Sequence, residues 1–379
     1  MNQIQQSNDK LFQQIADLIE LSRKRVKTAI DTTMVYTYYH VGQYIVEDEQ
    51  QGEYRAKYGK NVLSDLSNKL TNRFGKGWSV PQLKIIRQFY IIFSKRINTV
   101  YPIEKTNNLS SDSKQSTELV TIVDNFEEKP LFSLSWSHYL ILMRIKDSNA
   151  RSFYEIECAK QDWSIRQLQR QVSSCLYERL ALSRNKDEVM RLSREGHTIE
   201  KPKDVIKDPL TLEFLGIKPD ESYSESKLEN TIISKMQKFL LELGKGFLFE
   251  ARQKRFTFDE EHFFVDLVLY NRLLRCYCLI DLKIDKLTHQ DLGQMQMYVN
   301  YFDRYVKQES ENPTIGILLC KEKKDTLVEL TLPKDSNVFA SAYELYLPDK
   351  QLLQAKVKEW IEEFDENQEI KEEENNNGY

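Results

Sequence analysis

Three residues in the C-terminal half of the sequence have types and spacing that suit a metal site. Asp266 lies in the run 263–270, and Asp281 and Lys283 lie in the run 273–283. Both runs are rich in Phe, Val, Leu, Ile and Tyr, a composition typical of β-strands. Side chains alternate between the faces of a strand, so Asp281 and Lys283 share one face. Two neighbouring carboxylates are suitable oxygen ligands for a divalent cation, and the amine would lie beside it.

The two runs are expected to form a hairpin that places both carboxylates on one face. A polar kink at 271–272 joins them. In an antiparallel hairpin, the residue numbers of any two paired residues add up to the same constant. A loop of two residues (271–272) or four residues (271–274) makes that constant odd. An even and an odd position then share a face, as Asp266 and Asp281 do. With the longer loop they are diagonal neighbours, roughly 7–8 Å apart between backbones.

An alternative interpretation is that these charged residues only decorate the wet face of a sheet. The run Cys276–Leu282 is almost wholly apolar, which is typical of a central strand buried on both faces. Asp and Lys are seldom buried without a partner, and buried polar clusters usually mark functional sites. The pattern therefore favours a site.

Two helices are expected to flank the strands. The helix from about His289 carries Gln294 and Tyr298 one turn apart on the same face. The helix 225–243, before the strands, places Glu229 on its apolar stripe, where a carboxylate suggests a functional role. Glu225 and Glu242 on that helix are expected to face solvent, as the alternatives to Glu229.

A second informative segment lies in the N-terminal half, over residues 55–96. An amphipathic helix from Asn61 to Phe74, the turn Gly75-Lys76-Gly77 and a helix capped by Ser79 form a helix-turn-helix pattern. The segment carries ten Lys and Arg residues against the single acid Asp65. This asymmetry favours a polyanion partner over an ordinary solvated hairpin. The cations expected to bind nucleic acid are Arg73, Lys76, Lys84 and Arg87.

The remaining segments suggest the domain limits. Residues 98–129 are expected to be a loop, and a helix starting at Ser164 is expected to run to about Leu182. Its Arg166, Arg170 and Arg179 suit a solvated face and a nucleic-acid contact equally well. Three Xaa-Pro pairs make 196–222 the expected linker. We therefore predict a helical domain (1–195), a linker (196–222), a second domain (223–365) and an acidic disordered tail (366–379).

Composition bounds the class of protein. The 379 residues, 40% apolar and 11% aromatic, suffice for two domains with real cores. The N-terminus is polar, and no run approaches the roughly 20 apolar residues of a membrane span, so we expect neither a signal peptide nor membrane association. The five cysteines show no metal-ligand spacing, which fits reduced thiols in the cytoplasm. The net charge of −4 is the sum of a strongly acidic C-terminal end and a net positive charge on the rest of the chain.

The residues around the strand pair resemble the PD-(D/E)xK nuclease superfamily. Asp266 matches its first acidic position, and Asp281-Leu282-Lys283 matches the (D/E)xK motif. Gln294 and Tyr298 match the QxxxY element of the branch that includes the RecB nuclease domain. The element order α-β-β-β-α-β expected from residue 225 onward is also that of the superfamily core.

The chain as a whole resembles the YhcG-type family of bacterial nucleases. The matching blocks include GEYRAKYGKNVLSDLSNKLTNRFGKGWS, WSIRQLQRQVSSCLYERLALS and VDLVLYNRLLRCYCLIDLK. Val265 replaces the Pro of the superfamily name, and Asp281 stands where many members carry Glu. The resemblance implies an α+β protein: a mostly helical, winged-helix-like DNA-binding domain followed by a restriction-endonuclease-like αβββαβ domain. It also links the chain to mobile elements or genome defence.

The resemblance also implies roles for individual residues. Asp266, Asp281 and the Leu282 carbonyl would hold Mg²⁺ or Mn²⁺, with Glu229 completing the metal site. Lys283 would position the nucleophile and offset phosphate charge. Gln294 would orient either Lys283 or the substrate, and Tyr298 would contact the substrate backbone. The cations of the first strand, Arg252, Lys254 and Arg255, would lie beside that backbone.

The resulting hypothesis is a divalent-metal-dependent nuclease acting on DNA, and nothing in the sequence distinguishes RNA from DNA. Superfamily members often dimerise to cut both strands, so a homodimer is implied as well. Two alternatives remain. One is a catalytically silent nucleic-acid-binding protein, a partner of restriction or mobile-element proteins. The other is a protein-interaction partner that uses the helical half. The intact Asp266, Asp281, Lys283 and Gln294 favour the active enzyme.

Overall fold

The computed structural model describes residues 2–51, 59–100, 132–182, 186–218, 222–333 and 335–359. The chain divides into two compact units, residues 1–147 and 148–379. Within the described residues, the first unit contains helices alone and the second combines helices with a six-stranded sheet. The fold is therefore mixed α+β, as the sequence predicted. No described helix combines the length and apolar character that crossing a membrane requires.

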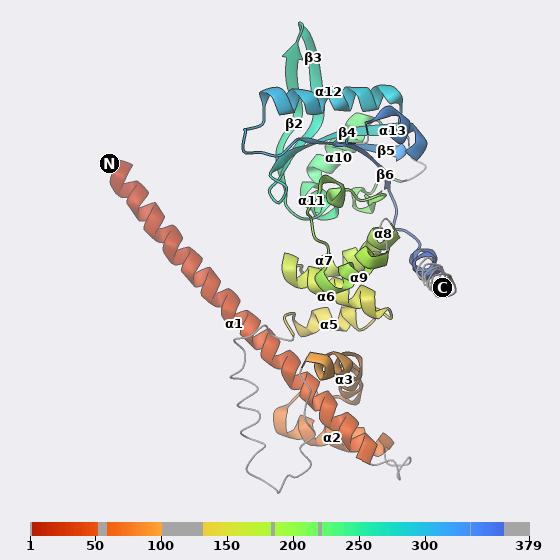
Figure 1. Ribbon diagram of the computed structural model, residues 1–379. Helices are drawn as coiled ribbons and strands as arrows, with labels where there is room; N and C mark the ends of the chain where they lie inside the picture. Colours follow the sequence, from red (N-terminus) through yellow and green to blue (C-terminus); the bar gives the residue numbers. More distant parts are fainter. Residues whose placement is uncertain are drawn as a thin grey trace, which may run out of the picture. The chain divides into compact units, whose positions relative to one another are not determined.

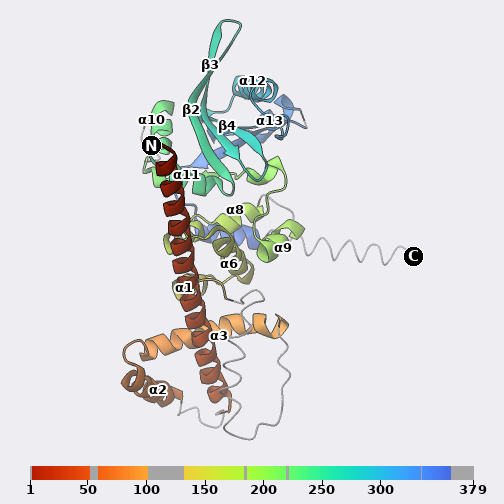
Figure 2. The ribbon, with the colours of Figure 1, turned by 90° about the vertical axis from the view of Figure 1, so that its left-hand side faces the viewer.

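The first unit is built on α1 (Asn2–Gln51), one helix of 50 residues. The sequence predicted two helices that meet near residue 31, but no Pro or Gly lies there to end the first. The other described helices of this unit are α2 (Gly59–Phe74), α3 (Val80–Val100) and α5 (Trp136–Leu142). Helix α3 packs across the C-terminal half of α1 (Figure 1, Figure 2).

The predicted helix–turn–helix is present in α2 and α3. Gly75 and Gly77 have φ angles of 84° and 121°, which favour glycine, so the turn depends on both. Ile45, Leu63 and Leu83 form a small core that ties α1, α2 and α3 together. Residues 101–131, where a wing after α3 would fall, lie outside the described part of the chain, as does most of the loop predicted over 98–129.

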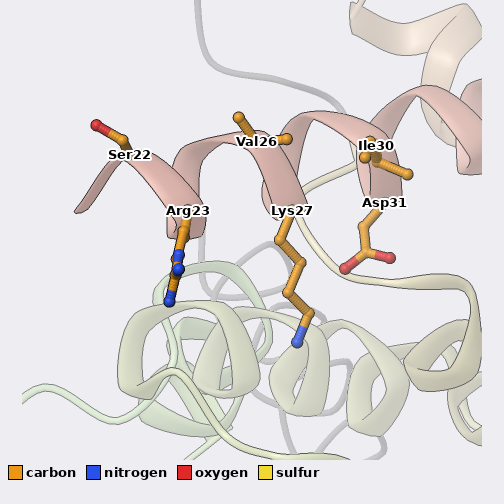
Figure 3. Close-up of a pocket in the computed structure, with 6 residues that line it drawn as sticks. All are labelled: Ser22, Arg23, Val26, Lys27, Ile30 and Asp31. Atoms are coloured by element: carbon orange, nitrogen blue, oxygen red, sulfur yellow. The ribbon is translucent and has the colours of Figure 1, made fainter. Parts of the chain in front are cut away.

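The N-terminal half of α1 carries both charged and apolar side chains on its surface. Figure 3 shows Arg23, Lys27 and Asp31 projecting from one side, while Val26 and Ile30 project from another. These residues line a surface pocket along the helix. The three charges recur every four residues, which is the pattern of a solvated helix face.

The second unit begins with helices α6 (Ser148–Gln161), α7 (Ile165–Ser173), α8 (Leu176–Leu182) and α9 (Lys186–Glu195). The sequence predicted one helix from Ser164 to about Leu182. The structure breaks it at Cys175, whose φ of 52° is not helical. The sequence also placed these helices in the N-terminal domain, whereas their contacts put them in the same unit as the sheet.

Buried ion pairs explain why α7 and α8 belong to this unit. Glu242, which is fully buried, accepts Nη1 of Arg170 at 2.9 Å and Nη1 of Arg179 at 2.8 Å. Burial alone would raise the pKa of Glu242, but Arg179, Lys207 and Arg170 lower it to about 2. The solvent-facing position predicted for Glu242 was therefore wrong. Neither interpretation of Arg170 and Arg179 holds, because both side chains pair with the buried Glu242, and Arg170 also pairs with Glu213.

The segment predicted as a linker is packed into the sheet domain. It supplies β1 (Leu210–Thr211), which pairs in parallel with β6 (Val338–Glu344) at the sheet edge. It also contains two short 3₁₀ turns, Pro202–Val205 and Glu213–Leu215. Its apolar residues fill the core on one face of the sheet: Val205, Leu210, Leu212, Leu215 and Ile217.

The remaining elements follow the predicted αβββαβ order. They are α10 (Glu225–Ser234), α11 (Met236–Leu243), β2 (Phe247–Phe258), β3 (Glu261–Asn271), β4 (Cys276–Lys286), α12 (His289–Tyr305), β5 (Ile315–Glu322), α13 (Asp325–Thr331) and β6. The sheet order is β1-β6-β5-β4-β3-β2, antiparallel among β2, β3 and β4 and parallel elsewhere. Helix α12 packs on one face, and α10 and α11 pack on the other (Figure 1). The central strand β4 is buried on both faces, as its apolar run predicted.

Candidate active site

The β3–β4 hairpin brings Asp266 and Asp281 together. Its loop spans residues 272–275, and the ladder runs from Asn271 opposite Cys276 to Leu267 opposite Ile280. Continued by one position, this register sets Asp266 opposite Asp281, and not diagonal to it as the sequence predicted for the four-residue loop. The shared face was predicted correctly, because this loop also gives an odd constant. Beyond this point β3 pairs only with β2, so the carboxylates lie where β3 and β4 separate.

Asp281 is buried, and its environment opposes its negative charge. Burial and the neighbouring charge of Asp266 raise its pKa to about 7, although Lys283 acts in the opposite direction. Lys283 Nζ lies 2.9 Å from Asp281 Oδ2 and 3.8 Å from Asp291 Oδ1. Burial lowers the pKa of Lys283, but Asp281, followed by Glu225 and Asp291, raises it, so the net shift is upward and the amine stays charged. One ammonium thus faces two carboxylates, which leaves an excess of negative charge.

Helix α12 adds Gln294 and Tyr298 near this cluster. Thr288 caps the helix in a reciprocal capping box with Asp291. Gln294 Nε2 donates to the Tyr298 hydroxyl at 2.7 Å, so the two side chains do stand together. Tyr298 is buried, and burial, followed by the charge of Asp281, raises its pKa to about 12. This hydroxyl therefore stays protonated at neutral pH and can donate a hydrogen bond.

Glu229 on α10 is connected to Asp266 through a residue that the sequence did not single out. Glu229 is 5% exposed, and its Oε1 accepts Arg252 Nε at 2.8 Å. Its Oε2 accepts Gln253 Nε2 at 2.9 Å, and the same Nε2 donates to Asp266 Oδ1 at 2.9 Å. The backbone N–H of Leu282 donates to Asp266 Oδ2 at 2.8 Å. The sequence signal available for Gln253 was only its place between two predicted substrate-binding cations.

The donor set suits a hard divalent cation that keeps much of its water. Asp266 and Asp281 supply two facing carboxylates, and burial together with the charge of Asp266 raises the pKa of Asp281, so a cation between them would stabilise its charged form. Within the described residues, no three acidic, His or Cys side chains converge as a ready-made metal cage. Mg²⁺ is commonly held by one or two carboxylates together with waters and substrate phosphate, so two carboxylates fit it.

The predicted nucleic-acid contacts fall into exposed side chains and side chains that already pair with a carboxylate. Arg73, Lys76 and Lys84 are exposed on the helix-turn-helix. Lys254 and Arg255 are exposed on β2, in the hairpin that extends beyond α12 in Figure 1. The remaining two are engaged: the Nε of Arg87 contacts Glu49 at 2.6 Å, and Arg252 contacts Glu229 and Asn230. Such pairing makes these two arginines less available to a phosphate.

Comparison with known proteins identifies both halves of the chain. Residues 203–358 match the family described as the YhcG PDDEXK nuclease domain, and residues 14–179 match the DUF1016 N-terminal domain. A curated protein named "Putative nuclease YhcG" from Escherichia coli (strain K12) is 38% identical over 350 residues, which cover 90% of this chain and 92% of that protein. The chain belongs to the YhcG family. Its C-terminal region is accordingly a nuclease domain of the PDDEXK type.

Two solved structures resemble this YhcG-family chain over 35% of its length. One is a crystal structure of a repair endonuclease from Pyrococcus abyssi, with 17% identity, a TM-score of 0.23 and 50% of that chain covered. The other is a structure of an EndoMS–dsDNA complex, with 15% identity, a TM-score of 0.24 and 51% of that chain covered. The YhcG-family chain thus spans about half the length of each, and likenesses this distant carry no argument about its substrate.

Proposed function

We propose that this chain is a divalent-cation-dependent nuclease that hydrolyses phosphodiester bonds in DNA. The observation that carries the proposal is the convergence of Asp266, Asp281 and Lys283 where two strands separate, with the ammonium 2.9 Å from one carboxylate. Structural ion pairs are normally close to charge balance, whereas this cluster has one more negative charge than positive once Asp281 is ionised. An excess of negative charge is suited to a cation, and the bound cation would in turn attract a phosphate group.

The residues have separate tasks in this proposal. Asp266, Asp281 and the Leu282 carbonyl would hold Mg²⁺ or Mn²⁺, which lowers the pKa of a bound water and neutralises phosphate charge. Lys283, kept charged by Asp281, donates hydrogen bonds to the attacking water or to a non-bridging phosphate oxygen. The protonated Tyr298 and its partner Gln294 donate to the substrate backbone. Glu229, held in place by its ion pair with Arg252, would complete the metal site beside Asp266.

The test is cleavage by the purified protein with Mg²⁺ or Mn²⁺. Linear, circular, single-stranded and branched DNA, together with RNA, would be compared as substrates. Lys283→Ala should abolish cleavage while leaving DNA binding intact. Lys286→Ala is the matched control, because Lys286 lies on the same strand with its side chain exposed and paired with Glu322. Normal cleavage by the Lys283→Ala variant would contradict the assignment, and cleavage of RNA alone would change the substrate class.

A silent nucleic-acid-binding protein is the second candidate, and the exposed cations of the helix-turn-helix favour binding in either case. We predict that replacing Lys76 and Lys84 together by Ala weakens DNA binding and makes the dependence of log K on log[salt] shallower by about two. The matched control replaces the exposed Lys324 and Lys356 of the second unit. Binding without any cation-dependent cleavage would identify the silent protein. An unchanged salt slope would show that α2 and α3 do not contact phosphate.

A further inference from the structure

Gln253 has a backbone conformation that is unusual for its residue type. It lies in β2 between Arg252, opposite Leu267, and Lys254, opposite Val265, so it faces Asp266 across the ladder. Its φ angle is 46°, in the left-handed region that residues with a side chain disfavour. Strain of this kind persists only where the surroundings enforce it, and it concentrates at functional sites.

The strained backbone allows two consecutive residues to reach one carboxylate. In a regular strand, neighbouring side chains point to opposite faces. Here Arg252 Nε reaches Glu229 Oε1 at 2.8 Å, and Gln253 Nε2 reaches Glu229 Oε2 at 2.9 Å. The left-handed turn at Gln253 thus redirects its side chain into the site.

The Gln253 amide uses both of its hydrogens on the candidate metal ligands. One hydrogen bond goes to Glu229 and the other to Asp266 Oδ1, at 2.9 Å each. Arg252 and the Leu282 N–H serve the two remaining oxygens of these carboxylates. Each of the four oxygens therefore accepts one protein hydrogen bond, and each keeps a second lone pair for another ligand.

We propose that Gln253 is a positioning residue of the cation site, which holds Glu229 on its helix beside Asp266 on its strand. The inference rests on the proposed cation-dependent nuclease. Without the amide, the two carboxylates repel each other and Glu229 is held by Arg252 alone. Groups that hydrogen-bond to metal-binding side chains fix the orientation of those side chains, and their loss typically weakens metal affinity by about 10- to 100-fold.

The experiment compares full-length wild-type protein with Gln253→Met, which keeps the length of the side chain and removes its donors. Calorimetric titration with Mn²⁺ alone should show a dissociation constant raised by about 10- to 100-fold. Cleavage by this variant should need correspondingly more cation and should recover to within a few-fold of the wild-type rate at saturation. Gln296→Met is the matched control: Gln296 lies on α12 and also loses two hydrogen bonds, to Asn300 and Ser336.

A second variant, Gln253→Gly, separates positioning from folding. Glycine accepts a φ of 46° without strain, so the melting temperature of the Gly variant should stay close to that of the wild type. Its cation affinity should fall as in the Met variant. If either variant folds and binds Mn²⁺ with the affinity of the wild type, the inference about Gln253 is overturned, while the proposed function stands. If the wild type itself binds no Mn²⁺, the proposed function fails and the inference fails with it. Failure of both variants to fold would assign Gln253 a structural role instead.

Discussion

The raised pKa of Asp281 predicts that the metal-free protein loses stability as the pH rises. An unfolded Asp titrates near its ordinary pKa of 3.8, whereas burial and the charge of Asp266 raise the pKa of Asp281 to about 7 in the folded protein. Between these values the folded state binds more protons than the unfolded state. The contribution of Asp281 to the free energy of unfolding is therefore fully present below pH 4 and is lost as the pH rises through 7.

The size of the effect follows from the two pKa values. Each tenfold change in a protonation equilibrium corresponds to about 1.4 kcal/mol, so a rise from 3.8 to about 7 corresponds to at most roughly 4 kcal/mol. Asp281→Asn keeps the shape of the side chain and removes its charge. We therefore expect this variant to match the wild type near pH 4 and to exceed its stability by about 2–4 kcal/mol at pH 8, while losing cleavage.

Urea unfolding at pH 4, 6 and 8 without divalent cations measures the difference. Asp285→Asn is the matched control, because Asp285 lies on the same strand with an exposed side chain. Mg²⁺ at a hundred times its dissociation constant should raise the free energy of unfolding of the wild type by about 2.7 kcal/mol, and that of Asp281→Asn by much less. A wild type that equals or exceeds the Asn variant in stability at pH 8 would refute the electrostatic account of this site.

Two further predictions concern packing. Glu242→Ala leaves the buried Arg179 without a carboxylate partner and leaves Arg170 with Glu213 alone, so it should lower the free energy of unfolding by about 3–5 kcal/mol in urea titrations; a loss below about 1 kcal/mol would mean that water reaches the cluster. Gly42→Ala brings a Cβ to 2.5 Å from the carbonyl oxygen of Ile86, and overpacking of about 1–3 kcal/mol should outweigh the roughly 1 kcal/mol gain in helix propensity. A higher melting temperature for the Ala variant would show that α1 and α3 separate without cost.

The sequence predicted most of the sheet domain because its local and global signals agree. The shared face of Asp266 and Asp281 followed from parity alone. Every loop with an even number of residues gives the same parity, so the conclusion held although the loop spans 272–275 and not 271–274. The exact pairing of residues depends on where the loop begins and ends, which is why the position of Asp266 opposite Asp281 was not predicted.

The long-range ion pairs were beyond prediction from the sequence for a different reason. Arg170 and Glu242 are 72 positions apart, and no local pattern states which buried carboxylate will meet which arginine. Three Xaa-Pro pairs made the segment 196–222 resemble a linker, but proline limits backbone conformation without deciding burial. Its apolar residues, from Val205 to Ile217, outweighed that signal and drew the segment into the core.

Gln253 was missed because the rule that located the other site residues excludes it. Alternation along a regular strand puts the neighbours Arg252 and Gln253 on opposite faces, so a search for side chains that share a face separates them. Only the positive φ at Gln253 brings them together on Glu229. A conformation that breaks the local rule has to be stabilised by its surroundings, and here those surroundings are the two carboxylates that its amide joins. The strain and the site therefore require each other, which ties the failure of alternation at Gln253 to the chemistry proposed for it.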